Sequence, residues 1–195
     1  MKRTLFATAV IATSLASPSL ADMSQYELDP THTAVYFKVD HIGFAKTLGI
    51  FTDVAGTFSY DTETQELQDV NVTIQAESVN TFNEARDGHV RNADFLHVSD
   101  HPEITFVATG GEPTSDTTGT VTGDLTILGQ TQPVTLDVTL NRVADYPFGH
   151  QREVLGLSMT TTIQRSDFGM TYAVDNGLVG DEVTINIETE AIKAD

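Results

Sequence analysis

The 195-residue chain contains no cysteine, few basic residues and no long apolar run. The absence of cysteine excludes thiol catalysis, thiolate ligation of a metal and a lipid anchor attached at a cysteine. It also excludes a disulfide framework, so a full-sized hydrophobic core must stabilise the fold. A membrane-spanning helix needs about 20 consecutive apolar residues, and no segment of the sequence supplies them. These absences predict one ordinary domain without a stable membrane anchor.

Basic residues are outnumbered almost threefold. Ten lysine and arginine residues stand against 28 aspartate and glutamate residues, which gives a formal net charge of −18. Such a surface argues against nucleic acid as a partner and against electrostatic adsorption to anionic lipid. The simplest interpretation is solubility in a salty or variable medium outside the cytoplasm. The charge therefore excludes partners without identifying one.

The first 21 residues resemble a secretory signal peptide. Lys2 and Arg3 form a positive start, an apolar run extends from Leu5 to Leu15, and Ser19-Leu20-Ala21 is a small-residue cleavage site. We expect export and cleavage after Ala21, leaving a mature domain of residues 22–195. This mature chain retains eight basic and all 28 acidic residues, a net charge of −20.

Eight segments alternate between apolar and polar residues, as antiparallel strands with one wet face do. On the side predicted to face inward they carry Val35, Phe37 and Val39; Val54, Gly56 and Phe58; Val70, Val72 and Ile74; Ile104, Phe106 and Ala108; Val121, Leu125 and Ile127; Val134, Leu136, Val138 and Leu140; Leu155, Leu157, Met159 and Ile163; and Val183, Ile185 and Ile187. Gly129-Gln130 fits a two-residue hairpin turn with glycine first. The pattern predicts an all-β fold.

An open antiparallel sheet of this size would leave edges ready to aggregate, whereas eight strands close into a barrel. A two-sheet sandwich is compatible with the same alternation. Between the third and fourth strands, Ala85, Val90, Ala93 and Leu96 recur at helical spacing until Pro102 ends the run. We expect one short helix there, where it would cap a barrel mouth.

The inward aromatic residues leave the use of the interior open. They are Phe37, Phe51, Phe58, Phe95, Phe106 and Phe168. Inward aromatic rings usually pack a core. In a barrel they can equally line a hollow, and the sequence pattern is the same for a packed barrel and a hollow one.

The helical segment also holds the residues with the most chemistry. Arg86 and His89 are i, i+3 neighbours and can direct hydrogen-bond donors at a phosphate, a carboxylate or a quinone oxygen. The alternative is local ion pairing with Glu84, Asp87 and Asp94, which is ordinary on a solvated helix.

No metal centre and no catalytic residue are expected. His89, His97 and His101 lie close in sequence, and the last two have i, i+4 spacing, but no HExxH pattern accompanies them. The nearest approach to a nucleophile elbow, beginning at Gly156, lacks the second glycine and lies in a predicted strand. A P-loop and a dinucleotide fingerprint are absent from the sequence.

Several motifs resemble those of the YceI-like family over essentially the whole mature chain. They are Leu28-Asp29 with His32 to Val39, Asp40-His41-Ile42-Gly43-Phe44, Gly49-Ile50-Phe51, Gly56-Thr57-Phe58, Ala85 to Leu96, His101-Pro102, Thr105-Phe106, Gly123 to Ile127 with Gly129, Thr131 and Pro133 to Leu136, Arg165 to Met170, and Val179 to Val183. Their order and spacing together are highly specific. One departure is His97-Val98-Ser99-Asp100, where relatives often carry an aromatic residue before the proline.

The resemblance implies a periplasmic, non-enzymatic protein with an eight-stranded, lipocalin-like antiparallel barrel around an apolar tunnel. Its ligand would be a long-chain isoprenoid lipid, such as an isoprenoid quinone or polyprenyl phosphate, with no other cofactor; a homodimer is left open. The tail would contact Phe37, His41, Ile42, Phe51, Phe58, Ile74, Phe95, Phe106, Leu125, Phe168 and Met170. Arg86, His89, Arg91 and Asn92 would contact the head group. The alternative function is an enzyme that acts on a long-chain amphiphile, for instance a hydrolase, in the same pocket.

Overall fold

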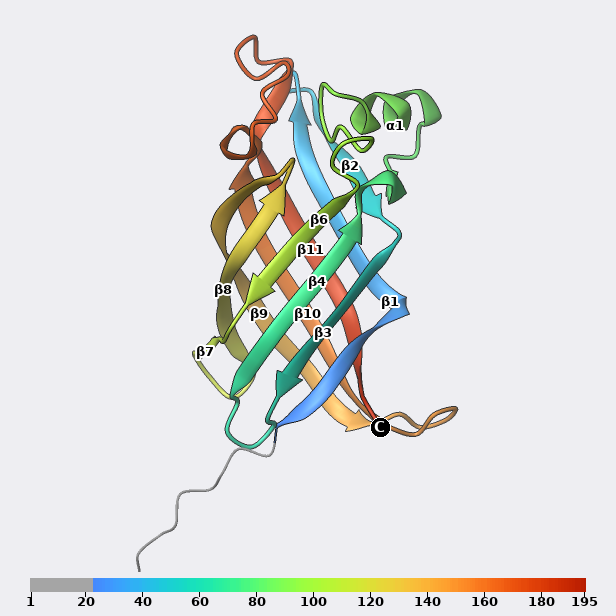
Figure 1. The fold of residues 1–195 in the computed structure, drawn as a ribbon, viewed down its shortest axis with the longest axis vertical. Helices are drawn as coiled ribbons and strands as arrows, with labels where there is room; N and C mark the ends of the chain where they lie inside the picture. The colour runs from blue at the N-terminus through green and yellow to red at the C-terminus, as the bar shows by residue number, and fades with distance from the viewer. Residues whose placement is uncertain (1–22) are drawn as a thin grey trace, which may run out of the picture.

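Eleven strands wind around a common axis in this computed structural model, which describes residues 23–195 (Figure 1). The strands are β1 (Ser24–His41), β2 (Ala45–Phe51), β3 (Val54–Tyr60), β4 (Leu67–Gln75), β5 (Val79–Asn80), β6 (Glu103–Ala108), β7 (Glu112–Pro113), β8 (Thr118–Ile127), β9 (Gln130–Asp145), β10 (Glu153–Gln164) and β11 (Val179–Lys193). The α-helix is α1 (Glu84–Arg91), and short 3₁₀ helices are η1 (Ala76–Ser78) and η2 (Arg165–Phe168). The predicted signal peptide lies outside the described residues, so its cleavage stays a prediction.

The sheet closes on itself because β1 pairs with both β11 and β3. Neighbouring strands follow the order β11, β10, β9, β8, β6, β4, β3 and β1, and all of these pairs are antiparallel. The first part of β1 pairs with β3 and its last part with β2, so β2 and β3 occupy one position in the barrel. The predicted eight-stranded antiparallel barrel is therefore confirmed, and the sandwich is wrong.

Three strands were missed, and one of them, β2, belongs to the barrel wall. β2 is AKTLGIF, and its inward side holds Thr47, Gly49 and Phe51 while Leu48 and Ile50 face outward. Small and polar residues thus point in and aliphatic residues point out, which is the reverse of the pattern used to recognise the other strands. β5 pairs with the outer edge of β2, and β7 pairs with β8; both are two-residue strands that lie outside the eight barrel positions.

The predicted hairpin turn was wrong by one residue. Ile127 pairs with Gln130, so the two loop residues are Leu128 and Gly129. Both have positive φ, 53° and 70°, which is the backbone of a type I′ turn rather than a turn with glycine first. The type I′ turn matches the right-handed twist of β8 and β9, and it holds Leu128 in a conformation that non-glycine residues seldom adopt.

The helix lies between β4 and β6, as predicted, but it is shorter than the helical spacing indicated. The Asn83 side chain caps its first turn by accepting from the Arg86 backbone N–H at 3.0 Å. It ends at Arg91, because Asn92 is extended and its side chain accepts from the Asp94 N–H. Ala93 and Leu96 therefore lie in the turns that follow. Together with η1, this segment covers the upper end of the barrel in Figure 1.

A wide bulge interrupts the seam between β1 and β11. Leu28 pairs with Ala191 and Thr33 with Thr189, so residues 29–32 all lie opposite Glu190. The bulge falls where β1 exchanges β3 for β2 as its other neighbour. Bulges increase local twist and redirect side chains, so this one bends β1 around the barrel.

Candidate functional site

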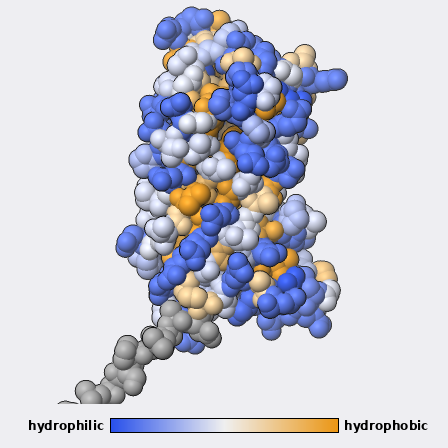
Figure 2. All heavy atoms as spheres, in the orientation of Figure 1, coloured by the Kyte–Doolittle hydropathy of each residue, from blue (hydrophilic) through white to orange (hydrophobic). Residues whose placement is uncertain are grey.

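The barrel is hollow. A cavity of about 580 Å³ lies inside it, within the range of roughly 300–1,000 Å³ that is usual for small-molecule sites. At one end its lining includes Ile42, Tyr172 and Leu178, and at the other end Gln65, Glu112 and Asp116. These end groups belong to loops at opposite ends of the strands, so the cavity is a tunnel along the barrel axis. By contrast, the outer face drawn in Figure 2 is mostly hydrophilic, with scattered hydrophobic residues between.

The structure places all the residues predicted to contact a lipid tail in the wall of this tunnel. They are Phe37, His41, Ile42, Phe51, Phe58, Ile74, Phe95, Phe106, Leu125, Phe168 and Met170. They come from β1, β2, β3, β4, β6, β8, η2, the turn between β1 and β2, and the loops after α1 and η2. Their contact with a lipid remains a prediction, whereas the hollow interior that it requires is present.

Two glycines make room for the aromatic rings of the wall. Gly49 pairs with Phe37 across β1 and β2, and a side chain on Gly49 would collide with the Phe37 ring. On β8, a Cβ on Gly123 would lie 2.6 Å from Cζ of Phe106. Each ring therefore packs against a backbone position that has no side chain, which leaves room for the ring in the wall of the barrel.

At the α1 end, Thr81 connects the helix to the tunnel wall. The buried Asp87 carboxylate accepts from the Thr81 backbone N–H at 2.6 Å and from its hydroxyl at 2.5 Å. Arg86 donates from Nε to Thr81 Oγ1 at 2.9 Å and from Nη2 to Thr81 O at 2.6 Å. The hydrogen bonds from Thr81, which outweigh burial, lower the pKa of Asp87, and the charges of Arg91 and Arg86 lower it further.

Arg86 keeps donors available. Its guanidinium has five N–H donors, and the two directed at Thr81 fix its orientation. Across residues 23–195 the remaining three have no hydrogen-bond partner, and Arg86 is part of the tunnel lining. The side chain is thus held in place at the mouth with hydrogen-bonding capacity to spare.

His89 belongs to an aromatic group at the same mouth. Its ring lies edge-to-face with Phe95 at 5.0 Å and with Tyr172 at 5.2 Å, and those two rings are 5.2 Å apart. Nε2 of His89 lies 2.9 Å from an Asp94 carboxylate oxygen. The three rings join α1 to the loop after η2 and narrow the tunnel mouth. The predicted local pairing of His89 with Asp94 is present beside its place in the lining.

Arg91 and Asn92, by contrast, lie away from the tunnel lining. The Arg91 guanidinium donates to the carbonyls of Glu77 at 2.8 Å and Val79 at 2.7 Å, which ties α1 to η1 and β5. The Asn92 side chain caps the turn that ends α1. Among the four predicted head-group residues, the structure therefore brings Arg86 and His89 to the mouth.

The histidines considered for metal do not assemble a site. His89 is engaged with Asp94, whereas His97 and His101 form an edge-to-face ring pair at 5.8 Å. Asp100 lies 3.5 Å from His97 Nε2, but within the described part of the chain neither pair belongs to a group of three ligand atoms that all lie within 4.8 Å of one another.

A family model for the YceI-like domain matches residues 26–191. The chain belongs to this family. A UPF0312 protein of Pseudomonas putida is 34% identical over 195 residues, covering 99% of both chains. The crystal structure of the Campylobacter jejuni YceI protein superposes with a TM-score of 0.73 at 31% identity, covering 81% of this chain and 91% of that one. A polyisoprenoid-binding domain from Saccharophagus degradans has the same fold, with a TM-score of 0.63, 14% identity and coverage of 87% and 98%.

One residue of this YceI-like protein that sequence reasoning missed is Arg165. It is 3% exposed and donates to four backbone carbonyls at 2.7–2.9 Å, those of Met170, Tyr172, Val179 and Gly180. Its guanidinium carbon lies 5.7 Å from the centre of the Phe95 ring. Burial lowers the pKa of Arg165, while the nearby Asp181 raises it. Arg165 thus holds the loop after η2 across the tunnel mouth.

The far end of the tunnel has its own closure. Gln65 donates from its side-chain amide to the carbonyls of Ser115 at 3.3 Å and Asp116 at 2.9 Å, linking the loop after β3 to the loop after β7.

No helix within residues 23–195 is long and apolar enough to cross a membrane. Family and fold together support a role in binding a ligand.

Proposed function

We propose that this YceI-like protein is a periplasmic lipid-binding protein that holds a polyisoprenoid, of the isoprenoid quinone or polyprenyl phosphate type, for transport, storage or scavenging. The single observation that carries the proposal is the apolar tunnel along the barrel axis. The S. degradans domain, which has the same fold and is described as polyisoprenoid-binding, supports the choice of lipid. The signal-peptide pattern of residues 1–21 supports the location.

The shape and chemistry of the tunnel suit a long branched chain. Valine, leucine, isoleucine, phenylalanine and methionine side chains form its middle, and the charged lining residues belong to its ends. Burial of apolar surface contributes roughly 25 cal/mol per Å², so a tail laid along the axis accounts for most of the binding free energy. An extended chain with methyl branches also fills a narrow tunnel better than a compact ligand does.

The α1 mouth suits the head group. Arg86 presents its remaining N–H donors there, and His89 lies across the same opening. A phosphate or a quinone oxygen accepts such hydrogen bonds, and the interaction is charge-assisted. We assign the head group to this mouth and the tail to the barrel interior.

The α1 mouth also provides a route for loading. Three residues of its lining, Ile42, Tyr172 and Leu178, are 44–46% exposed, and Phe44 and Phe82 beside them are 88% and 71% exposed. Exposed apolar side chains that surround an opening favour contact with a lipid bilayer. Because the protein is strongly acidic, we propose that this contact depends on apolar insertion rather than on attraction to anionic lipid.

The enzymatic alternative gains no support from the tunnel wall. Its hydroxyl groups belong to threonines and to Tyr60 and Tyr172, and within the described residues none of them has a hydrogen bond to a histidine. An activated nucleophile requires such a base within hydrogen-bond reach. We therefore propose binding without turnover.

Native mass spectrometry of the protein purified from its own cell envelope tests this function. We expect a complex with one intact isoprenoid lipid per chain, released by organic solvent and identified by its fragmentation. A tunnel that carries no lipid, together with failure to take up a short-chain quinone or a polyprenyl phosphate, contradicts the proposal. Recovery of a cleaved amphiphile instead of an intact one favours the enzyme.

A further inference from the structure

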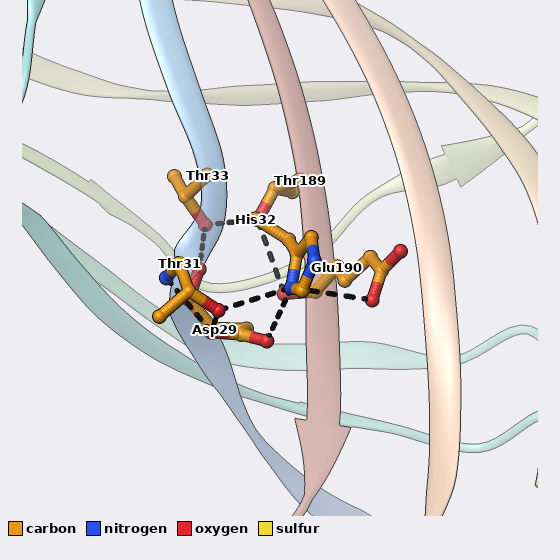
Figure 3. Close-up of polar contacts among 6 residues, drawn as sticks. All are labelled: Asp29, Thr31, His32, Thr33, Thr189 and Glu190. Carbon is orange, nitrogen blue, oxygen red and sulfur yellow. Dashed lines mark hydrogen bonds and ion pairs between the residues drawn. The ribbon is translucent and has the colours of Figure 1, made fainter. Parts of the chain in front are cut away.

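The bulge of β1 gathers a second group of chemically capable side chains on the outside of the barrel. Asp29 and His32 lie within the four residues that oppose Glu190 on β11 (Figure 3). One ligand atom from each of the three residues lies within 4.8 Å of the other two. The group is separate from the tunnel lining and plays no part in the function proposed above.

Each side chain is held where it meets the others. Asp29 Oδ1 accepts from the Thr31 backbone N–H at 2.8 Å and from its hydroxyl at 2.7 Å, which leaves Oδ2 directed at His32. His32 Nδ1 lies 2.8 Å from that Oδ2 and 3.8 Å from Glu190 Oε2. A hydrogen bond of 2.6 Å between Thr33 and Thr189 joins the two strands beside the group. Figure 3 shows the imidazole between the two carboxylates.

These separations suit a shared metal ion. Ligand atoms at about 2.0–2.2 Å from a tetrahedral zinc ion lie roughly 3.3–3.6 Å apart. The distances of 2.8 Å and 3.8 Å bracket this value, so shifts of roughly half an ångström bring His32 into position. Glu190 is 34% exposed and can rotate inward, whereas Asp29 is 14% exposed and fixed by Thr31.

The charge of the group selects the class of ion. With a neutral imidazole the two carboxylates carry −2, which a divalent cation balances. Binding through Nδ1 requires the neutral imidazole to carry its proton on Nε2, so the proton between Nδ1 and Asp29 moves to Nε2, or to solvent if the ring is doubly protonated. One nitrogen and two carboxylate ligands favour zinc and neighbouring transition metals over magnesium and calcium, which prefer oxygen alone. We propose that Asp29, His32 and Glu190 form a binding site for a divalent transition metal, which cross-links β1 to β11 at the seam of the barrel.

The test is calorimetric titration of the purified protein with Zn²⁺, and in parallel with Mg²⁺ and Ca²⁺. The proposal expects one Zn²⁺ per chain, and an affinity that falls at least about tenfold in His32→Ala and in Glu190→Gln. Two matched controls retain the affinity: His101→Ala, which removes the competing histidine pair, and Glu182→Gln, which removes an exposed carboxylate of the same strand.

A second readout measures the cross-link itself. Zn²⁺ should raise the thermal unfolding midpoint of the unchanged protein and of both controls, because it binds the native seam, but not that of Glu190→Gln. Glu190→Gln replaces a partly exposed side chain by one of nearly the same shape, so it decides the matter if His32→Ala fails to fold. If both site variants bind Zn²⁺ as tightly as the unchanged protein does, the ion binds elsewhere and the proposal is overturned. Ca²⁺ binding as tight as Zn²⁺ binding also overturns it, because that is the behaviour of a diffuse acidic surface.

Discussion

At the scale of single residues, the tunnel mouth is organised by side chains that bond to backbone. Thr81 accepts from Arg86 and donates to Asp87, and Arg165 donates to four carbonyls of the loop that crosses the mouth. A charged donor directed at several carbonyls fixes a loop more firmly than an exposed ion pair does. The mouth is therefore built before any ligand arrives.

Asp87 gives this network a pH dependence. Its pKa in the folded protein is lower than the ordinary value of 3.8, so ionisation stabilises the fold above about pH 4, and the stabilisation is lost as the pH falls through the folded pKa. Asp87→Asn should lower the unfolding midpoint at pH 7, and its difference from the unchanged protein should shrink below pH 4. Thermal unfolding of both proteins, followed by circular dichroism between pH 2 and pH 7, measures this difference in unfolding midpoint. The exposed Asp175→Asn serves as the control, and a difference that stays constant down to pH 2 contradicts the assignment.

Arg165 should be sensitive even to a conservative change. Lysine keeps the charge but cannot donate to four carbonyls in the fixed directions of a guanidinium. We expect Arg165→Lys to lower the unfolding free energy by about 3 kcal/mol, because buried carbonyls lose charged donors. Hydrogen exchange should show faster exchange in residues 169–180, whereas Arg142→Lys, on an exposed part of β9, should leave both measurements unchanged. Unaltered exchange in the loop would show that Arg165 does not hold it.

At the scale of elements, the sequence predicted those strands whose inward residues are large and apolar. β4 and β6 were recognisable from alternation alone, because Val72 and Phe106 face in while Asn71 and Thr105 do not line the tunnel. β2 was missed, because the inward Gly49 has no side chain to mark a face. Burial of Arg165 was equally hidden, since it depends on a distant loop that folds back over the residue. The alternation of residues along a segment predicts a strand. The burial of a residue by a loop from elsewhere in the chain is formed only when the barrel closes, so the sequence pattern does not reveal it.

Gly49 therefore makes a testable contribution. In Gly49→Ala the new methyl collides with the Phe37 ring, which must turn into the tunnel. We expect a loss of about 1–3 kcal/mol in unfolding free energy and weaker binding of long isoprenoid tails than of short ones. Gly156→Ala on β10 is the matched control, because the nearest atom to its new methyl is 3.8 Å away. Equal effects of the two substitutions would contradict the packing of Phe37 over Gly49.

At the scale of the whole molecule, barrel closure and composition act together. Closure removes the free edges of the main sheet, and a net charge of −18 opposes nonspecific aggregation. Whether the interior was packed or hollow could not be decided from alternation, because it depends on the summed volume of inward side chains against the barrel radius. In this eight-stranded barrel, with glycine rather than a larger residue at positions 49 and 123, the inward side chains leave a cavity of about 580 Å³.

The exposed rim of the α1 mouth predicts how the protein takes up lipid. Phe44→Ser combined with Phe82→Ser should slow transfer of a fluorescent isoprenoid from zwitterionic vesicles, because less apolar surface enters the bilayer. Equilibrium affinity for a short-chain quinone in solution should not change, since neither side chain is part of the tunnel lining. Phe148→Ser, on the exposed loop between β9 and β10, is the control. Transfer that depends on anionic lipid and disappears at high salt would instead indicate electrostatic docking.

The last prediction separates tail from head group. Phe106→Asp places an unpaired carboxylate in the tunnel wall, so it should nearly abolish binding of every isoprenoid. Arg86→Ala with His89→Ala removes donors at the wet mouth, where a charge-assisted hydrogen bond contributes about 1–2 kcal/mol. That double variant should bind a phosphate-headed or quinone-headed ligand moderately more weakly, and a headless isoprenoid as tightly as before. Titration of both variants with a short-chain quinone and a headless isoprenoid makes the comparison, and Glu84→Ala on the exposed face of α1 is the control. If the double variant loses both ligands while Phe106→Asp still binds them, the ligand lies on the surface of α1 and not in the tunnel.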